Sequence, residues 1–467
     1  MANIIRGMLS FGNELYVVRD GYLFEINTSD VVSYRGGLDT STGSVTMATN
    51  GLELMIADGT DGYVLNLTTH AYQKIDDADF PGAGSVAYQD GYFIVNDPGE
   101  GTVYISNSYD GLNWDALDYG TAESAPDDVV RVFSAFQELW VFGVSSTEVW
   151  YNSGNADYPF ERMAGGVLEE GLIAVHSPAT VDNGIAWLTD KKQVVHARGM
   201  NPVKISTPQI EYQIAQYTDV SDAIGFSYIH EGHEFYVLTF PTGDATWVFD
   251  AATGFWHERS SYKTVSTTGR WRANCYAFFN NKHLVGDYAI GKIYELDYDT
   301  YTDNYHSIQR IRTAQSINNS RKNMFIHRFE VEFEAGVGVT NPTTTAYAAG
   351  TTYDEGDYVT SGGKYYISLL DSNVGHTPAS SATWWEEIEA TIWTGNDPQA
   401  SLDYSVDGGH TFSNTEDRSI GTSTAYTTRA VWRRKGRGRD WIPRVTITAP
   451  VKVVIIGATL EATPGVV

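Results

Sequence analysis

The chain has 467 residues, of which 58 are acidic and 31 basic, and its formal charge at pH 7 is −27. A chain this acidic repels polyanions, which excludes ordinary nucleic-acid binding driven by phosphate neutralisation. The single cysteine, Cys275, cannot form an internal disulfide, and we expect it to act as a small apolar side chain. The N-terminal stretch reaches Glu14 before an apolar segment forms, so no signal peptide is expected.

The composition is typical of an all-β protein. Aromatic residues are abundant, with 30 Tyr, 12 Trp and 19 Phe, and 45 glycines punctuate the chain. Aromatic side chains favour strands, and frequent glycines favour short turns between them. The length predicts two or three domains.

One pattern recurs through the first three hundred residues, a polar turn followed by a strand with alternating apolar positions. Its apolar marker positions are Leu23, Val64, Val103, Val149, Val194, Val248 and Ile293. The steps between them are 41, 39, 46, 45, 54 and 45 residues, a spacing typical of propeller blades. We therefore predict a β-propeller of about seven blades over residues 1–300.

The one long step of this repeat contains residues 206–217, which predict a short helix. Thr207 can cap the helix, Pro208 suits its first turn, and Ile210 and Ile214 fall on one face. The helix is expected to be an insertion on the ring.

Strand patterns return after a polar stretch at 301–323. Phe329, Val331 and Phe333 alternate on one face, and further apolar alternation follows residue 400. These patterns predict a C-terminal β-sandwich of about five or six strands over 301–339 and 393–467. Residues 340–392 have dense aromatics and their own turns, which predicts a small inserted β module.

The segment YSVDGGHTFS, at 404–413, has the spacing of the Asp-box known from sialidases. Its signature residues are Ser405, Asp407, Gly409, Thr411 and Phe412. We interpret them as turn builders: Asp407 accepts backbone N–H bonds, Gly409 permits a positive φ, and Phe412 anchors the hairpin in the core.

A sialidase would also need three arginines converging on the substrate carboxylate, together with a Tyr nucleophile and an acid. The chain has enough arginines for such a trio, but no pattern points to one. We therefore predict no enzyme, no catalytic residue and no cofactor. The segment HEGHE, at 230–234, lacks the histidine spacing of a helical zinc site, so a hairpin turn is expected there rather than a metal site.

The segment RRKGRGRD concentrates positive charge in an acidic chain. Its cationic residues are Arg433, Arg434, Lys435, Arg437 and Arg439. A nucleic-acid contact and a subunit contact both explain such a cluster. The overall charge favours docking on an acidic neighbouring subunit, so we expect a basic interface patch.

Several stretches together resemble the packaged-DNA stabilisation proteins, or tail-hub and head-completion proteins, of short-tailed bacteriophages. The resemblance covers about 130–338 and 396–462, and it is carried by 142–190, 199–214, 231–261 and 430–462 together with DYSVDGGHTFSNTEDRSIG. It implies a structural virion protein of the tail, assembled in the host cytoplasm as a homo-hexameric ring.

In that family the ring lies below the portal and its adaptor protein and continues the DNA channel. It retains the genome until a needle or plug is displaced, and fibre or spike proteins are further partners. The packaged DNA passes the channel without sequence-specific binding. The alternative is a propeller that binds or hydrolyses glycans for host attachment.

The inserted block resembles small chitin- and cellulose-binding modules. The matching positions are Tyr353, Gly356, Asp357, Val359, Gly363, Tyr366, Pro378 and Trp384. The resemblance implies weak contact with a surface glycan, and exposed flat aromatics stack well on sugar rings. We expect Trp384, Trp385 and Tyr366 to make that contact.

Overall fold

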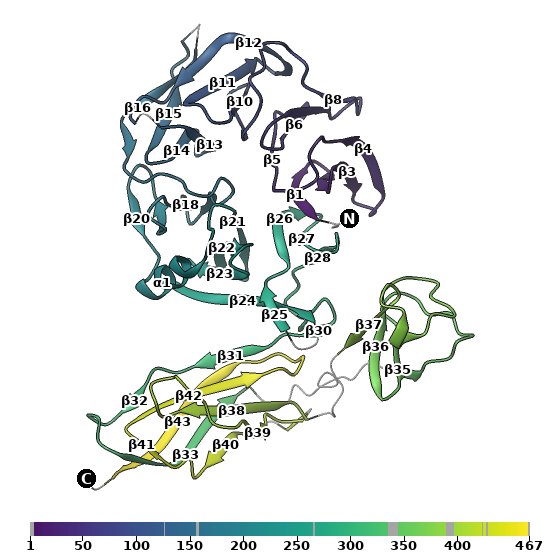
Figure 1. Ribbon diagram of the computed structural model, residues 1–467, viewed down its shortest axis with the longest axis vertical. Coiled ribbons are helices and arrows are strands. Elements are labelled where there is room, and N and C mark those ends of the chain that lie inside the picture. The colour runs from purple at the N-terminus through teal and green to yellow at the C-terminus, as the bar shows by residue number, and fades with distance from the viewer. Residues whose placement is uncertain are drawn as a thin grey trace. The chain divides into compact units, whose positions relative to one another are not determined.

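The computed structural model describes residues 4–125, 127–155, 158–264, 267–334, 344–388, 397–422, 424–425 and 428–465 (Figure 1). Strands dominate this part of the chain, which holds one α-helix and one short 3-10 helix. The chain divides into two compact units. The first comprises Met1–Ser261 with Thr268–Leu296, and the second Tyr262–Thr267 with Asp297–Val467.

The first unit is a ring of seven antiparallel sheets, as Figure 1 shows. The first four sheets are β1–β4 (Ile5–Phe11, Glu14–Arg19, Tyr22–Asn27, Val32–Gly37), β5–β8 (Thr46–Thr49, Glu53–Ala57, Gly62–Asn66, Tyr72–Lys74), β9–β12 (Val86–Gln89, Tyr92–Asn96, Thr102–Asn107, Asp110–Thr121) and β13–β16 (Val129–Ala135, Glu138–Gly143, Thr147–Asn152, Phe160–Leu168). The other three are β17–β20 (Ala179–Val181, Gly184–Leu188, Val194–Ala197, Pro202–Lys204), β21–β25 (Ile224–His230, His233–Phe240, Ala245–Asp250, Phe255–Thr264, Thr267–Arg270) and β26–β28 (Ala273–Phe279, Lys282–Asp287, Ile293–Glu295).

The marker positions of the sequence repeat all fall on the third strand of a blade. These strands are β3, β7, β11, β15, β19, β23 and β28. Six of the seven side chains are at most 2% exposed, and Ile293 is partly buried. A β-propeller of seven blades is therefore confirmed in the described residues, and its period reflects one buried position per blade.

Neighbouring blades are held together by apolar clusters, and the ring is closed in the same way. Ile5, Leu15 and Val17 of the first blade pack against Ala277 and Phe279 of the last. The last blade has three strands, and no strand from the N-terminus completes it among the described residues. Closure therefore rests on side-to-side packing rather than on a sheet shared by the two ends of the ring.

The predicted helix is present as α1 (Pro208–Gln216). Thr207 caps it by accepting a hydrogen bond from Ile210 N over 3.4 Å. Ile210 and Ile214 are buried against the fifth and sixth blades, so the helix covers the blade junction where the repeat is longest.

The second unit contains a β-sandwich. One sheet has five strands, β31 (Arg310–Thr313), β32 (Ile317–Asn318), β38 (Gln399–Ser405), β39 (Glu416–Ser419) and β42 (Asp440–Ile447). The other has four, β33 (Met324–Phe333), β40 (Ala430–Arg433), β41 (Arg437–Gly438) and β43 (Ile455–Pro464). The estimate of five or six strands was therefore too low. β31 and β32 lie in the polar stretch 301–323 and pair only at the sheet edge, and β39 and β41 are short and carry no apolar alternation.

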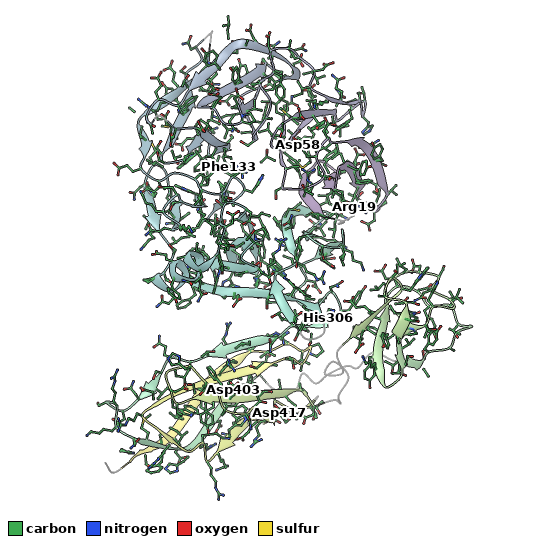
Figure 2. All side chains as sticks on the ribbon, viewed as in Figure 1. Arg19, Asp58, Phe133, His306, Asp403 and Asp417 are labelled. Carbon is green, nitrogen blue, oxygen red and sulfur yellow. The ribbon has the colours of Figure 1, made fainter. Side chains whose placement is uncertain are left out.

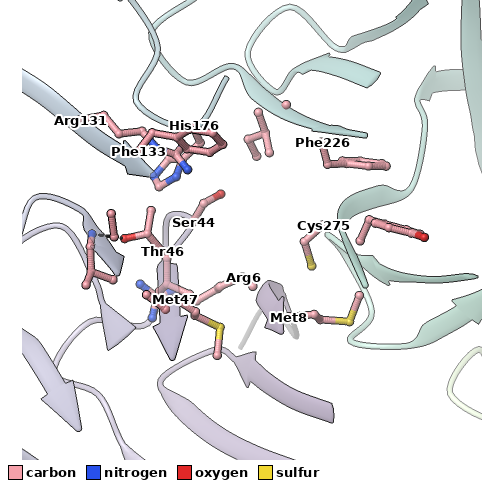
Figure 3. A pocket seen from close by; sticks show the side chains of 18 of the residues that line it. Arg6, Met8, Ser44, Thr46, Met47, Arg131, Phe133, His176, Phe226 and Cys275 are labelled. Atoms are coloured by element: carbon pink, nitrogen blue, oxygen red, sulfur yellow. Dashed lines mark hydrogen bonds between the residues drawn. The ribbon is translucent and has the colours of Figure 1, made fainter. Parts of the chain in front are cut away.

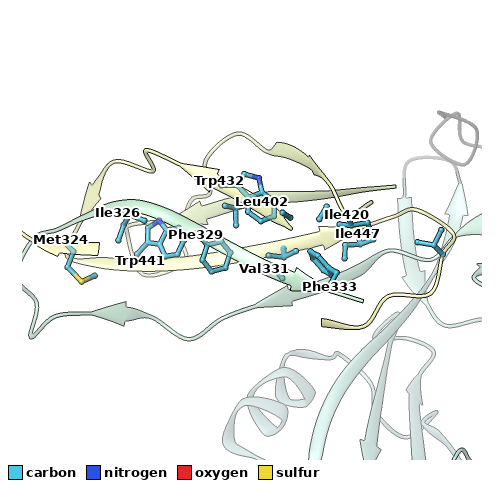
Figure 4. Close-up of a cluster of buried hydrophobic side chains, with 14 residues drawn as sticks. Met324, Ile326, Phe329, Val331, Phe333, Leu402, Ile420, Trp432, Trp441 and Ile447 are labelled. Carbon is cyan, nitrogen blue, oxygen red and sulfur yellow. The ribbon is translucent and has the colours of Figure 1, made fainter. Parts of the chain in front are cut away.

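The sandwich core lies between these two sheets (Figure 4). The predicted apolar face of β33 is buried, with Phe329, Val331 and Phe333 at most 5% exposed. Trp432 and Trp441 are fully buried beside it, and the Phe329 and Trp441 rings meet edge-on at 5.3 Å between centroids.

The inserted block forms a small sheet of its own. Its strands are β34 (Thr345–Ala346), β35 (Tyr358–Ser361), β36 (Lys364–Ser368) and β37 (Trp385–Ile388), with the 3-10 helix η1 at Pro378–Ser380. A short ribbon, β29 (Thr302–Asp303) and β30 (His306–Ser307), lies earlier in the same unit. None of the described helices has the length and apolar character needed to span a membrane.

Candidate functional site

The Asp-box forms the turn between β38 and β39, as the sequence predicted. Asp407 accepts hydrogen bonds from Thr411 N over 2.9 Å and from the Thr411 hydroxyl over 2.6 Å. Ser405 Oγ donates to Asp407 Oδ1 over 2.7 Å and accepts from Gly409 N over 2.9 Å. These bonds, chiefly those from Thr411, hold the pKa of Asp407 well below its usual range. The carboxylate is thus fully used in shaping the turn.

The expected role of Phe412 needs a correction. Phe412 is half-buried and lies outside the apolar core of the sandwich. The Arg444 guanidinium lies over its ring, with Cζ 3.8 Å from the ring centroid, and Arg444 Nε donates to Asp403 Oδ1 over 2.9 Å. Figure 2 labels Asp403 in the sandwich. The aromatic ring is therefore anchored by a cation rather than by apolar packing.

The basic segment is only partly a surface patch. Arg433, Arg434, Arg437 and Arg439 are exposed. Lys435, which was expected to belong to the patch, is 4% exposed, and its ammonium pairs with Glu416 of the opposite sheet. Lys435 lies in the loop between β40 and β41, where Arg434 and Gly436 on either side of it have positive φ. This loop turns the one side chain inward, so the exposed patch consists of the four arginines.

The aromatic residues of the inserted block mostly form its core, which corrects the expected exposure of two of them. Trp385 is 2% and Tyr366 4% exposed, and both belong to the cluster that holds Tyr353. Trp385 Nε1 also donates to His376 O over 2.6 Å. Of the three proposed glycan contacts, only Trp384 is partly exposed. It packs against the same cluster, and its ring stacks on His376 at 3.9 Å between centroids.

The HEGHE segment is the turn between β21 and β22. His230 and His233 face each other across it, and the two residues between them have positive φ, 51° at Glu231 and 80° at Gly232. His233 Nδ1 lies 2.9 Å from Asp250 Oδ2. The described residues contain no group of three or more His, Cys, Asp or Glu side chains suited to a metal ion.

A central cavity of about 430 Å³ was not anticipated from the sequence. Inner strands β1, β5, β9, β13, β21 and β26 line it, and His176 contributes from a loop (Figure 3). Arg6 and Arg131 are among its lining residues, and no aspartate or glutamate is. Cys275 also reaches the cavity, and burial raises its thiol pKa to about 12. No local motif marks these residues, because each comes from a different blade.

Two family comparisons identify the family of this chain. A family described as Bacteriophage P22 Gp10, beta-propeller, matches residues 2–301. A second, described as Bacteriophage P22 Gp10, beta-sandwich, matches residues 376–463. The chain therefore belongs to the P22 Gp10 family of phage packaged-DNA stabilisation proteins, and it is a structural protein of the phage virion.

The comparisons with curated proteins and with solved structures find only weak similarity or none. No curated protein matches the chain. BamB from Moraxella catarrhalis is 10% identical with a TM-score of 0.39, covering 62% of this chain and 82% of that one. The computationally designed Ika8 protein is 10% identical (TM-score 0.38; 63% and 97% covered), and a chain of the Mitotic Checkpoint Complex is 12% identical (TM-score 0.38; 59% and 83%). Scores this low carry no argument about function.

Proposed function

We propose that the protein forms a homo-hexameric ring at the phage tail, below the portal and its adaptor. The ring continues the DNA channel and retains the packaged genome until a needle or plug is displaced. The observation that carries this proposal is the family match across both the propeller and the sandwich, in a family of packaged-DNA stabilisation proteins. Fibre or spike proteins are further proposed partners.

The charge of the chain supports a steric rather than an adhesive mode of retention. The formal charge of −27 supports an acidic channel wall, which would repel phosphate and let DNA slide past without being gripped. Retention then depends on the plug. Neutralising channel-facing carboxylates, once imaging of the ring has identified them, should slow ejection in vitro. Unchanged ejection kinetics would rule out this electrostatic role.

We propose no catalytic role for the propeller. Retaining and inverting glycoside hydrolases ordinarily use a pair of carboxyl groups, and sialidases use a tyrosine with an acid and three arginines. The wall of the central cavity, as far as the structure describes it, holds two arginines and no carboxylate. Release of sugar from sialylated or other glycosides by the purified chain would favour the glycan-cleaving alternative instead.

Particles that lack the protein provide the direct test. They should package DNA but lose it, which a nuclease-protection assay measures as a fall in protected genome. Supplying the purified chain before nuclease treatment should restore protection. Particles without the protein that keep a full, protected genome would contradict the proposed role. Particle imaging of the chain mixed with the portal and adaptor tests its place in the tail.

A further inference from the structure

The central cavity of the propeller has a charge that contrasts with the rest of the chain. Acidic residues outnumber basic ones by 58 to 31 overall, yet the cavity wall carries Arg6, Arg131 and His176 and no carboxylate. Its volume of about 430 Å³ lies within the usual range of small-ligand pockets. A pocket with this lining favours a negatively charged occupant.

Arg131 has a buried charge that an occupant of the cavity would compensate. Its Nη1 donates to Val175 O over 2.6 Å, and its Cζ lies 5.2 Å from the centre of the Phe133 ring. Its Nε is buried and has no hydrogen-bond partner among the described residues. Burial lowers the Arg131 pKa to about 10, so the side chain stays charged at neutral pH without a carboxylate in the cavity wall. A buried charge without a counter-ion is costly, and an anion in the cavity would compensate it.

Two neighbours supply further donors. Figure 3 shows His176 beside Arg131 at the cavity wall, with Thr46 also facing the cavity. Burial, and then the charges of Arg131 and Arg6, lower the His176 pKa to about 3, so its imidazole is neutral at neutral pH and still has one N–H. The Thr46 hydroxyl accepts from Val86 N over 2.9 Å, which leaves its proton for another acceptor.

Arg6 has a different part in the same cavity. It is 1% exposed, and its guanidinium donates to Gly43 O, Asp20 O, Thr40 O and the Thr40 hydroxyl over 2.6 to 2.9 Å. These bonds fix its position in the first blade. Asp58 and Asp20 act on the Arg6 charge and offset part of it. Arg131 has no carboxylate partner among the described residues, so it is the stronger source of positive potential in the cavity.

We propose that the central cavity of the propeller binds a small oxyanion, a phosphate or a carboxylate, held chiefly by the Arg131 guanidinium. This site goes beyond the proposed virion role. It lies within one chain and requires neither the hexameric ring nor DNA. A bound anion would link the inner strands of the blades around the propeller axis and so stabilise the propeller.

Calorimetric titration of the full chain at constant ionic strength tests the proposal. Inorganic phosphate and acetate are the two probes, and whichever binds identifies the anion class. We expect saturable binding that Arg131→Gln weakens at least tenfold. Arg19→Gln, which removes an equal charge from the exposed side of β2, should leave binding unchanged. Absence of saturable binding with both anions, or equal affinity in Arg131→Gln and the wild type, would overturn the proposal.

A second measurement does not depend on the variant folding. Crystals of the wild-type protein soaked in tungstate should show anomalous density within contact distance of the Arg131 guanidinium. An empty central cavity in the soaked crystals would also overturn the proposal.

Discussion

The side-chain amide of Asn274 donates a hydrogen bond to the main-chain carbonyl of Ile5 over 2.9 Å, and thereby joins the last blade of the propeller to the first. The two residues are 269 positions apart, and both are buried. This bond crosses the seam that the apolar cluster of Ile5, Leu15 and Phe279 closes. Ring closure thus combines apolar packing with a buried polar contact.

Replacing Asn274 by alanine should weaken this seam. The substitution leaves the Ile5 carbonyl without its buried donor, which costs about 1–3 kcal/mol of unfolding free energy. Denaturant unfolding of the purified chain measures the change. Asn113→Ala removes an exposed amide that donates to Asp110, and should cost less than about 0.5 kcal/mol. Equal losses of unfolding free energy in the two variants would show that the Asn274–Ile5 bond stabilises the protein no more than an exposed side-chain hydrogen bond does.

The propeller was predictable because its sequence carries a period. Each blade places one apolar residue of its third strand in the interior, and such residues, Leu23 and Val194 among them, recur at similar intervals along the sequence. The helix α1 was predictable for a similar reason, since Thr207 and Pro208 mark its start locally.

Features that depend on distant residues were not predictable. Lys435 looks like its arginine neighbours in the sequence, and only its pairing with Glu416 across the sandwich reveals that it points inward. Trp385 and Trp384 are adjacent and chemically identical, yet the fold buries the first fully and the second only in part. Arg131 and His176 meet at the central cavity because the fourth and fifth blades pack side by side, which no local pattern encodes.

The Asp407 turn should make the stability of the sandwich depend on pH. Because its hydrogen bonds lower the pKa of Asp407 in the folded state, the ionised carboxylate stabilises the fold above the ordinary Asp pKa of about 4. That stabilisation is lost as the pH falls toward the lower, folded-state pKa. The melting temperature of Asp407→Ala should therefore lie below that of the wild type at pH 7, and the gap should narrow at pH 3.

Thr411→Val is the matched control for this turn. It removes the hydroxyl that donates to Asp407 Oδ2 but keeps the backbone N–H that donates to Oδ1. It should lower the melting temperature less than Asp407→Ala does. A gap between wild type and Asp407→Ala that stays constant from pH 7 to pH 3 would contradict the linkage.

The exposed arginines of the basic segment should act on assembly and not on folding. Arg433→Gln with Arg434→Gln removes two exposed charges, so the unfolding free energy should change by less than about 1 kcal/mol in total. If the patch docks on an acidic neighbouring subunit, ring formation should weaken and become less sensitive to salt. Sedimentation velocity at low and high salt measures both effects. Arg321→Gln with Lys322→Gln removes two other exposed charges of the same unit, and equal effects in both double variants would contradict a specific interface.

Lys435 should show the opposite behaviour. Its side chain is 3% exposed and paired with Glu416, which is 45% exposed and so remains solvated when the lysine is removed. Lys435→Ala should cost about 1–3 kcal/mol through lost packing and the lost charged hydrogen bond. Chemical unfolding measures this loss. A Lys435→Ala protein that is as stable as the wild type but fails to form hexameric rings would contradict this prediction. It would show that Lys435 acts in the interface together with the four arginines.

Substitutions of the two adjacent tryptophans of the inserted block should distinguish a role in glycan contact from a role in folding. Trp385→Ala empties a site that is 2% exposed and breaks the bond to His376 O, so it should cost about 3–5 kcal/mol and unfold the block. Trp384→Ala removes a partly exposed ring that packs against this cluster, so it should cost less than Trp385→Ala and leave the block folded. If Trp384 contacts a surface glycan, a glycan-array signal of the full chain should disappear in Trp384→Ala and survive in Trp384→Phe, which keeps a flat ring. No signal from the wild type, or one that Trp384→Ala leaves unchanged, would end the glycan hypothesis for this residue.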